Sequence, residues 1–219
     1  MAGKNIVVLS DGTWSKWESD DSKATNVQKL CRLLVDDPGQ GQITHYDPGV
    51  GTDFFRLTGG AFGVGVSENI RQAYRFISAH YEPKDRIYLF GFTRRAFTVR
   101  SLGGMIAMCG IQFPWVDRTG EAFRIYVGKE ETAAARFRFH YSHPSRVIQV
   151  IGVWDTVGAL GVPFETLNKL NPLSHRFHDT TLAPTVRYGF QAVALDEDRP
   201  LFEPTLWDES KSVPPQIVE

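Results

Sequence analysis

The sequence has few of the features that mark secreted, membrane-spanning or disulfide-rich proteins. Only two of its 219 residues are cysteine. Cys31 and Cys109 both lie in apolar segments typical of helices, so we expect reduced thiols rather than a disulfide. No apolar run is long enough to span a bilayer, and no apolar leader follows Met1. These absences predict no integral membrane segment and a cytoplasmic protein, or one exported without a cleaved signal peptide.

An excess of positive charge and the usual metal-binding spacings are also missing. The 24 basic and 25 acidic residues nearly cancel, which argues against nucleic acid as a partner. No His-x-x-x-His, Cys-x-x-Cys or calcium-loop pattern occurs, so we expect neither a metal nor a cofactor. The glycine-rich segment Gly59–Gly65 lacks the Lys-Ser/Thr pair of a phosphate-binding loop and follows no clear strand. A loop before a helix is therefore favoured there over a nucleotide site.

Apolar runs that alternate with helix-like segments are what the chain does have. Continuous apolar runs predict strands at residues 6–9, 43–46, 86–92 and 147–154. Helices are predicted from the cap residues Thr25-Asn26 to residue 34, from Ser67 to residue 77, at 96–106 and near 118–139. Residues 186–195 fit a helix or a strand. The pattern predicts one α/β domain over residues 1–219, with a mostly parallel central sheet in a three-layer sandwich.

A residue with a carboxylate or hydroxyl side chain follows each of the four predicted strands. Asp11, Asp47, Thr93 and Asp155 each come directly after an apolar run. The carboxyl ends of parallel strands share one edge of a sheet, and ligands bind at that edge. These four residues are therefore expected to line one rim.

The segment from Arg86 to Thr98 nearly spells the G-x-S-x-G nucleophile elbow of α/β-hydrolases, in which a strained strand-to-helix turn exposes a hydroxyl. Thr93 stands in the place of the serine and Arg95 in the place of the second glycine. Asp155 ends the next long strand, where a triad acid is expected. The alternatives are an ordinary turn residue at Thr93 and, at Asp155, a carboxylate that caps its own turn.

Six ordered motifs make the likeness to a known family specific. They are Leu9-Ser-Asp-Gly-Thr-Trp14, Thr25-Asn-Val27, His45-Tyr-Asp-Pro-Gly-Val-Gly-Thr52, Gly91-Phe-Thr-Arg-Arg-Ala-Phe-Thr98, Val153-Trp-Asp-Thr-Val-Gly158 and Ala194-Leu-Asp-Glu197. Together they resemble the α/β-hydrolase domain of unknown function that also forms the catalytic domain of one class of type VI secretion phospholipase effectors.

The resemblance implies an α/β-hydrolase-like fold and hydrolysis of carboxylic esters or phospholipids by a nucleophile, an acid and a histidine. Thr93 then aligns with the nucleophile and Asp155 with the acid. The amide of Arg94 would be one oxyanion donor, and an amide of the loop Asp11-Gly12-Thr13 the other.

Two further departures from the family pattern concern the histidine base of the triad. Gln191 stands where the family pattern is expected to carry a histidine, and the strand that would carry the triad histidine is expected beyond Glu219. His175 and His178, in a loop-rich region after the acid, are the candidate bases within the chain. Lack of a final strand would expose a sheet edge to a protein partner. The alternative to an ester or phospholipid hydrolase is therefore a catalytically inactive ligand-binding or interaction domain that keeps the fold.

Overall fold

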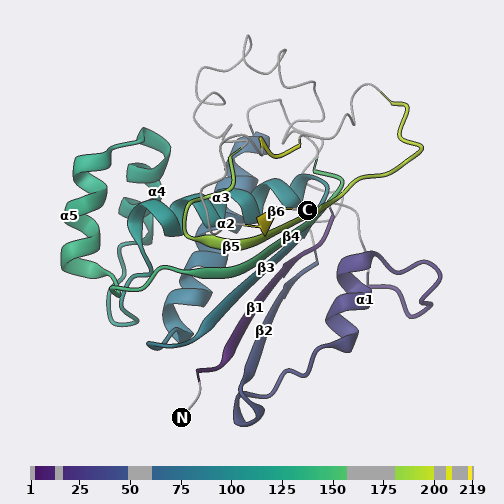
Figure 1. Cartoon of the computed structure of the whole chain (residues 1–219), viewed down its shortest axis with the longest axis horizontal. Helices are drawn as coiled ribbons and strands as arrows, with labels where there is room; N and C mark the ends of the chain where they lie inside the picture. The colour runs from purple at the N-terminus through teal and green to yellow at the C-terminus, as the bar shows by residue number, and fades with distance from the viewer. Residues whose placement is uncertain are drawn as a thin grey trace.

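The computed structural model contains a parallel sheet with helices packed on both of its faces (Figure 1). Neighbouring strands pair in the order β2-β1-β3-β4-β5-β6, and every pairing is parallel. The strands are β1 Asn5–Ser10, β2 Gln42–Asp47, β3 Arg86–Phe92, β4 Ile148–Trp154, β5 Val186–Ala192 and β6 Ile217–Val218. The residues that the structure describes are 3–12, 17–48, 61–156, 181–199, 206–208 and 217–218. The predicted α/β class is confirmed.

Both faces of the sheet are apolar because alternate side chains of each strand point to opposite sides. In β1, Ile6 and Val8 belong to the larger core cluster, whereas Val7 and Leu9 belong to a smaller cluster on the other face. Burial on two faces explains why this strand reads as a continuous apolar run rather than an alternating one.

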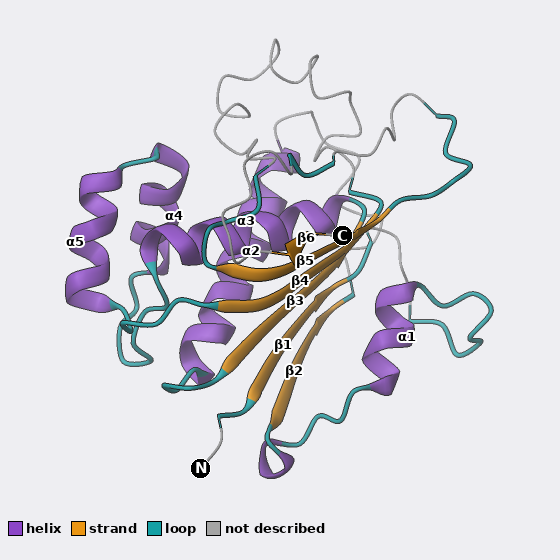
Figure 2. Cartoon of the chain, viewed as in Figure 1, coloured by secondary structure: helices purple, strands orange, loops and turns teal. Residues whose placement is uncertain are grey.

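The helices divide between the two faces (Figure 2). Helices α2 and α3 pack on the face of the larger cluster, while α1 packs against β1 and β3 in the smaller one. Helices α4 and α5 contact α3. The bounds are α1 Asn26–Leu33, α2 Ala61–His80, α3 Arg94–Cys109, α4 Thr119–Gly128 and α5 Glu131–Tyr141, with a short 3₁₀ helix at Pro38–Gln40.

Three predicted element bounds need correction. Helix α2 starts at Ala61, so the segment expected to be a loop up to Gly65 is helical; burial of the later residues Ile70, Tyr74 and Ile77 outweighs the low helix propensity of its glycines. The stretch near 118–139 is two helices, because Lys129 takes a left-handed conformation with φ 53°. The ambiguous segment 186–195 forms β5 up to Ala192.

The sheet has one more short strand beside β5. Ile217 and Val218 pair with Tyr188 and Gly189 as β6. The β-branched side chains of these two residues favour the extended backbone of this strand.

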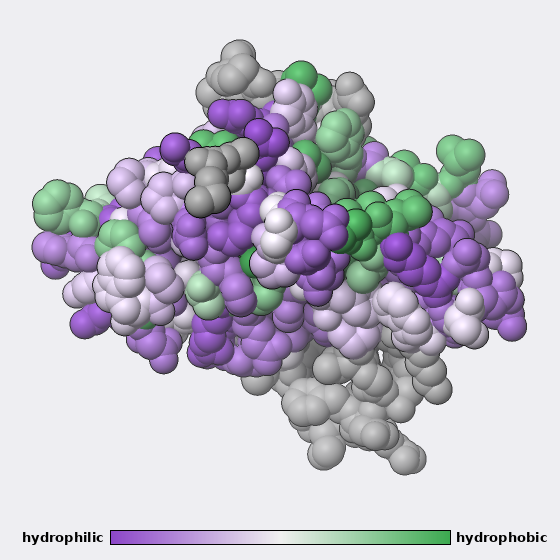
Figure 3. Space-filling model, turned by 90° about the horizontal axis from the view of Figure 1, so that it is seen from below, coloured by the Kyte–Doolittle hydropathy of each residue, from purple (hydrophilic) through white to green (hydrophobic). Residues whose placement is uncertain are grey.

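The face seen from below the view of Figure 1 is largely hydrophilic, with apolar side chains gathered in a few separate groups (Figure 3). Large exposed apolar side chains come from distant elements, such as Leu33 of α1, Trp115 before α4 and Phe139 of α5. Among the helices that the structure describes, none is both long and apolar enough to cross a membrane. Cys31 and Cys109 are both free thiols, as expected.

Candidate active site

Thr93 forms a strained turn between β3 and α3. Its backbone has φ 52° and ψ −122°, a conformation that is rare for any residue with a side chain and rarer for a β-branched one. Hydrogen bonds from the Thr93 amide to the carbonyl of Trp154 (2.9 Å) and from the Ala96 amide to the carbonyl of Thr93 (3.1 Å) hold the turn. The Thr93 side chain does not cap the helix that it precedes. The elbow shape is therefore kept although threonine replaces serine.

Gly91 allows the helix to pass close to the strand at this turn. A Cβ on Gly91 would lie 2.7 Å from Ala96 Cα and 2.7 Å from the carbonyl oxygen of Arg95. Both neighbours are backbone atoms of the first turn of α3, which cannot move away without opening the elbow. This is the physical requirement behind the first glycine of G-x-S-x-G.

We expect Gly91→Ala to lower the free energy of unfolding by about 1–3 kcal/mol, the usual cost of overpacking. Gly120→Ala is the matched control, because a Cβ on that helical glycine would meet nothing within 4 Å. The control should be neutral or stabilise by up to about 1 kcal/mol, the difference in helix propensity. Urea denaturation measures both, and equal midpoints for the two variants would contradict the close approach.

Arg95 occupies the second glycine position without widening the turn. Its side chain is 2% exposed, and Nη1 lies 3.0 Å from Oδ2 of Asp47 at the end of β2. The contact is an ion pair whose angle is not that of a well-aligned hydrogen bond. Burial lowers the pKa of Arg95, and the Asp47 carboxylate opposes that shift. The sequence placed Asp47 on the rim, but nothing in it indicated Arg95 as the partner.

Asp155 lies beside Thr93 at the carboxyl edge of the sheet. Phe92 of β3 pairs with Trp154 of β4, so the two residues follow the ends of neighbouring strands, which lie about 4.8 Å apart. Oδ1 of Asp155 accepts a hydrogen bond of 2.5 Å from the amide of Ala194, in the loop after β5. The carboxylate is thus oriented by a neighbouring loop, and the residue has a φ of 44°.

Asp11 is fully buried, and its carboxylate connects three elements. Oδ2 accepts hydrogen bonds of 2.8–2.9 Å from the Thr25 hydroxyl, Nε2 of the Gln28 side chain and the Tyr46 hydroxyl. Burial, followed by the hydrogen bond to Asp11, raises the pKa of Tyr46. Asp11 therefore fastens the end of β1 to α1 and β2, a structural role that its position at a strand end did not reveal.

The amides expected to form an oxyanion hole differ in their surroundings. The Gly12 amide donates a hydrogen bond of 2.7 Å to Oδ1 of Asp11. Arg94 is the first residue of α3, so its amide lies at the positive end of the helix dipole next to Thr93. Burial and then Arg95 lower the pKa of its guanidinium. Thr13 and the candidate bases His175 and His178 lie outside the described residues.

The histidines within the described ranges pack against aromatic side chains or lie in helices. His45 stacks on Phe76 of α2 with ring centroids 4.7 Å apart, and burial lowers its pKa. His143 packs edge-on against Tyr81 and Phe113. It precedes the start of β4, whereas Asp155 follows the other end of that strand. His80 ends α2 and His140 lies in α5. Gln191, expected to be a histidine by the family pattern, accepts a hydrogen bond of 2.9 Å from the Trp207 amide.

In the parts of the chain that the structure describes, no group of three or more His, Cys, Asp or Glu side chains could hold a metal ion. The described groups at the rim include the Thr93 hydroxyl, the Asp155 carboxylate and the amides at the start of α3.

An all-parallel sheet with a strained strand-to-helix turn at its carboxyl edge defines an α/β-hydrolase-like protein. The family model for the catalytic domain of type VI secretion (T6SS) Tle1-like phospholipase effectors matches residues 4–218, and the chain belongs to this family.

One curated relative extends the comparison to a eukaryote. The chain is 31% identical over 231 residues to the uncharacterized protein YEL023C of Saccharomyces cerevisiae. The match covers 92% of this chain and 32% of that protein, so the chain spans about a third of the relative's length. No solved structure matches the chain.

Proposed function

We propose that this chain hydrolyses carboxylic esters, phospholipids among them, with Thr93 as the nucleophile and Asp155 as the acid. The observation that carries the proposal is the backbone of Thr93. Strain of about 1–3 kcal/mol at such a residue persists only where the surrounding structure enforces it, and it is concentrated at functional sites. Membership of the Tle1-like phospholipase effector family supports lipid esters as the substrate class.

In the proposed reaction, a histidine base removes the proton from Thr93 Oγ1 as that oxygen attacks the ester carbonyl carbon. The Arg94 amide stabilises the oxyanion, and the alcohol leaves with the proton from the base. Water, deprotonated by the same base, then releases the acid and restores the threonine. Asp155 would orient the imidazole and stabilise its cationic form. His175 and His178 are the proposed candidates for the base.

The second candidate is an inactive domain that binds an acyl or lipid ligand. It is favoured by the buried Arg95–Asp47 pair at the elbow and by Gln191, which is engaged with Trp207. It is also favoured by the surroundings of the described histidines, which pack against aromatic side chains or lie on helices. A threonine methyl at the elbow restricts χ1 and would slow the attack.

Hydrolysis of short-chain nitrophenyl esters by the chain and by Thr93→Ser distinguishes the two candidates. We expect turnover by the chain and a rate about tenfold higher in Thr93→Ser, because the methyl no longer limits the rotamer in a strained backbone. Thr132→Ser, on the exposed side of α5, should leave the rate unchanged. Absence of turnover in both folded proteins would contradict the hydrolase and leave the binding domain.

A further inference from the structure

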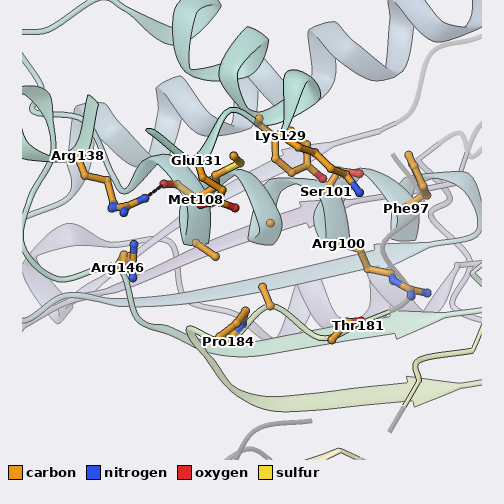
Figure 4. Close-up of a pocket in the computed structure, with 14 residues that line it drawn as sticks. Phe97, Arg100, Ser101, Met108, Lys129, Glu131, Arg138, Arg146, Thr181 and Pro184 are labelled. Carbon is orange, nitrogen blue, oxygen red and sulfur yellow. Dashed lines mark hydrogen bonds between the residues drawn. The ribbon is translucent and has the colours of Figure 1, made fainter. Parts of the chain in front are cut away.

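A cavity of about 490 Å³ runs along α3, and neither Thr93 nor Asp155 lines it (Figure 4). It begins near Phe97, one helical turn after Thr93, and extends towards Met108. The α4–α5 turn and α5 form one wall, and the segment 181–184 before β5 forms the other. We call it the basic cavity, for the charges described next.

Four cationic side chains line the basic cavity against one carboxylate, that of Glu131. They come from four separate parts of the fold: Arg100 from α3, Lys129 from the α4–α5 turn, Arg138 from α5 and Arg146 from the segment before β4. Figure 4 shows Arg138 and Arg146 at one end of the cavity and Arg100 at the other. Cations from unrelated elements face one space, as expected where an anion binds.

Arg138 and Arg146 share a single carboxylate in the cavity, that of Glu131. Arg138 donates a hydrogen bond to the carbonyl of Met108, which is neutral. Arg146 makes no hydrogen bond or ion pair within the described part of the chain. Burial lowers the pKa of Arg146, and repulsion from Arg138 adds to the shift, whereas Glu131 opposes it. A bound anion would relieve this repulsion.

A serine hydroxyl also lies at the basic cavity. Ser101 lines the cavity and is 3% exposed as a whole residue. Its hydroxyl makes no hydrogen bond in the described part of the chain and is not among the fully buried polar atoms that lack a partner, so part of its surface is open. Such a hydroxyl can donate a hydrogen bond to a ligand oxygen, which adds a neutral donor to the four cations.

We propose that the basic cavity binds a phosphate group, carried either by a soluble phosphate ester or by a phospholipid headgroup. Guanidinium groups match the geometry of phosphate oxygens and are charged at any physiological pH. The volume accommodates a phosphate together with a short polyol. Binding there requires no turnover at Thr93, so it is independent of the proposed hydrolysis.

The test measures binding to the full chain and to Arg146→Gln. The soluble probes are inorganic phosphate and glycerol 3-phosphate, followed by calorimetry; the lipid probes are vesicles of phosphatidylcholine with and without phosphatidic acid, followed by co-sedimentation. Loss of a charge-assisted contact should weaken binding about tenfold or more in Arg146→Gln. Arg136→Gln removes the same charge from an exposed site on α5 and should bind as the parent does.

Each outcome decides the proposal. Calorimetric binding of the soluble probes, weakened in Arg146→Gln alone, identifies a soluble phosphate ester as the ligand class. Binding only to vesicles that contain phosphatidic acid, with the same dependence on Arg146, identifies a headgroup. Absence of binding to every probe at millimolar phosphate, or equal weakening in Arg146→Gln and Arg136→Gln, would overturn it. A melting temperature near that of the parent establishes that Arg146→Gln is folded.

Discussion

Replacing Thr93 by valine should abolish ester hydrolysis while leaving the fold intact. Valine keeps the β-branched shape at φ 52° and ψ −122°, so the elbow is preserved, but it lacks the Oγ1 that would attack the ester. Loss of a triad nucleophile leaves only the acceleration due to binding and the oxyanion donors, so we expect kcat/KM to fall by at least about a thousandfold. Release of nitrophenol and of fatty acid from phospholipid vesicles measures the loss.

Stability distinguishes a chemical effect from a structural one. The Thr93 side chain does not cap α3, so its hydroxyl contributes little to folding, and Thr93→Val should melt at nearly the temperature of the parent. Thr132→Val makes the same change on the surface of α5 and should retain full activity. If Thr93→Val were as active as the parent, another group would be the nucleophile, and the elbow would be a structural remnant.

The sheet could be predicted from the sequence because its strands are buried on both faces. Residues 6–9, 86–92 and 147–154 read as continuous apolar runs, and β1, β3 and β4 lie there within one residue at most of the predicted ends. The helix break at Lys129 could not be predicted, because a single left-handed residue leaves no trace in apolar periodicity. The predicted start of helix α2, at Ser67, is six residues too late. The glycines before it indicated a loop, whereas in the structure they belong to the helix.

The candidate site was predictable where it depends on topology and not where it depends on side-chain partners. Parallel strands bring their carboxyl ends to one edge, which placed Thr93 beside Asp155. The same rule placed Asp11 on the rim, although its carboxylate is buried and fully engaged by α1 and β2. A strand-end position identifies the edge, whereas three-dimensional contacts decide whether the side chain faces a ligand or the core.

Arg95 shows how an elbow can tolerate a residue that its sequence pattern excludes. A glycine is normally needed there so that the helix can pass close to the neighbouring strands. In this chain the guanidinium extends to the end of β2 and pairs with Asp47. The carboxylate offsets the cost of burying the charge, so the backbone of the turn keeps its shape. The pair thus links the second glycine position to the Asp47-Pro-Gly motif after β2.

Asp47→Ala should therefore lower the free energy of unfolding by about 3 kcal/mol, the lower end of the range for breaking a buried ion pair. Arg95 is 2% exposed and would be left as an uncompensated charge, whereas Asp47 is 22% exposed, so water can reach part of the site. Chemical denaturation measures the loss. Asp21→Ala, which breaks the pair between Arg32 and a carboxylate that is 80% exposed, is the control and should cost less than about 1 kcal/mol.

The double variant Arg95→Met, Asp47→Ala decides whether the loss comes from the unpaired charge. Methionine fills much of the same volume without a charge, and replacing both members of a buried pair by apolar groups is often neutral or stabilising. We therefore expect the double variant to recover most of the stability that Asp47→Ala loses. Equal losses in Asp47→Ala and Asp21→Ala would instead mean that water or another group solvates the Arg95 guanidinium. The close packing of the elbow would then not depend on the pair.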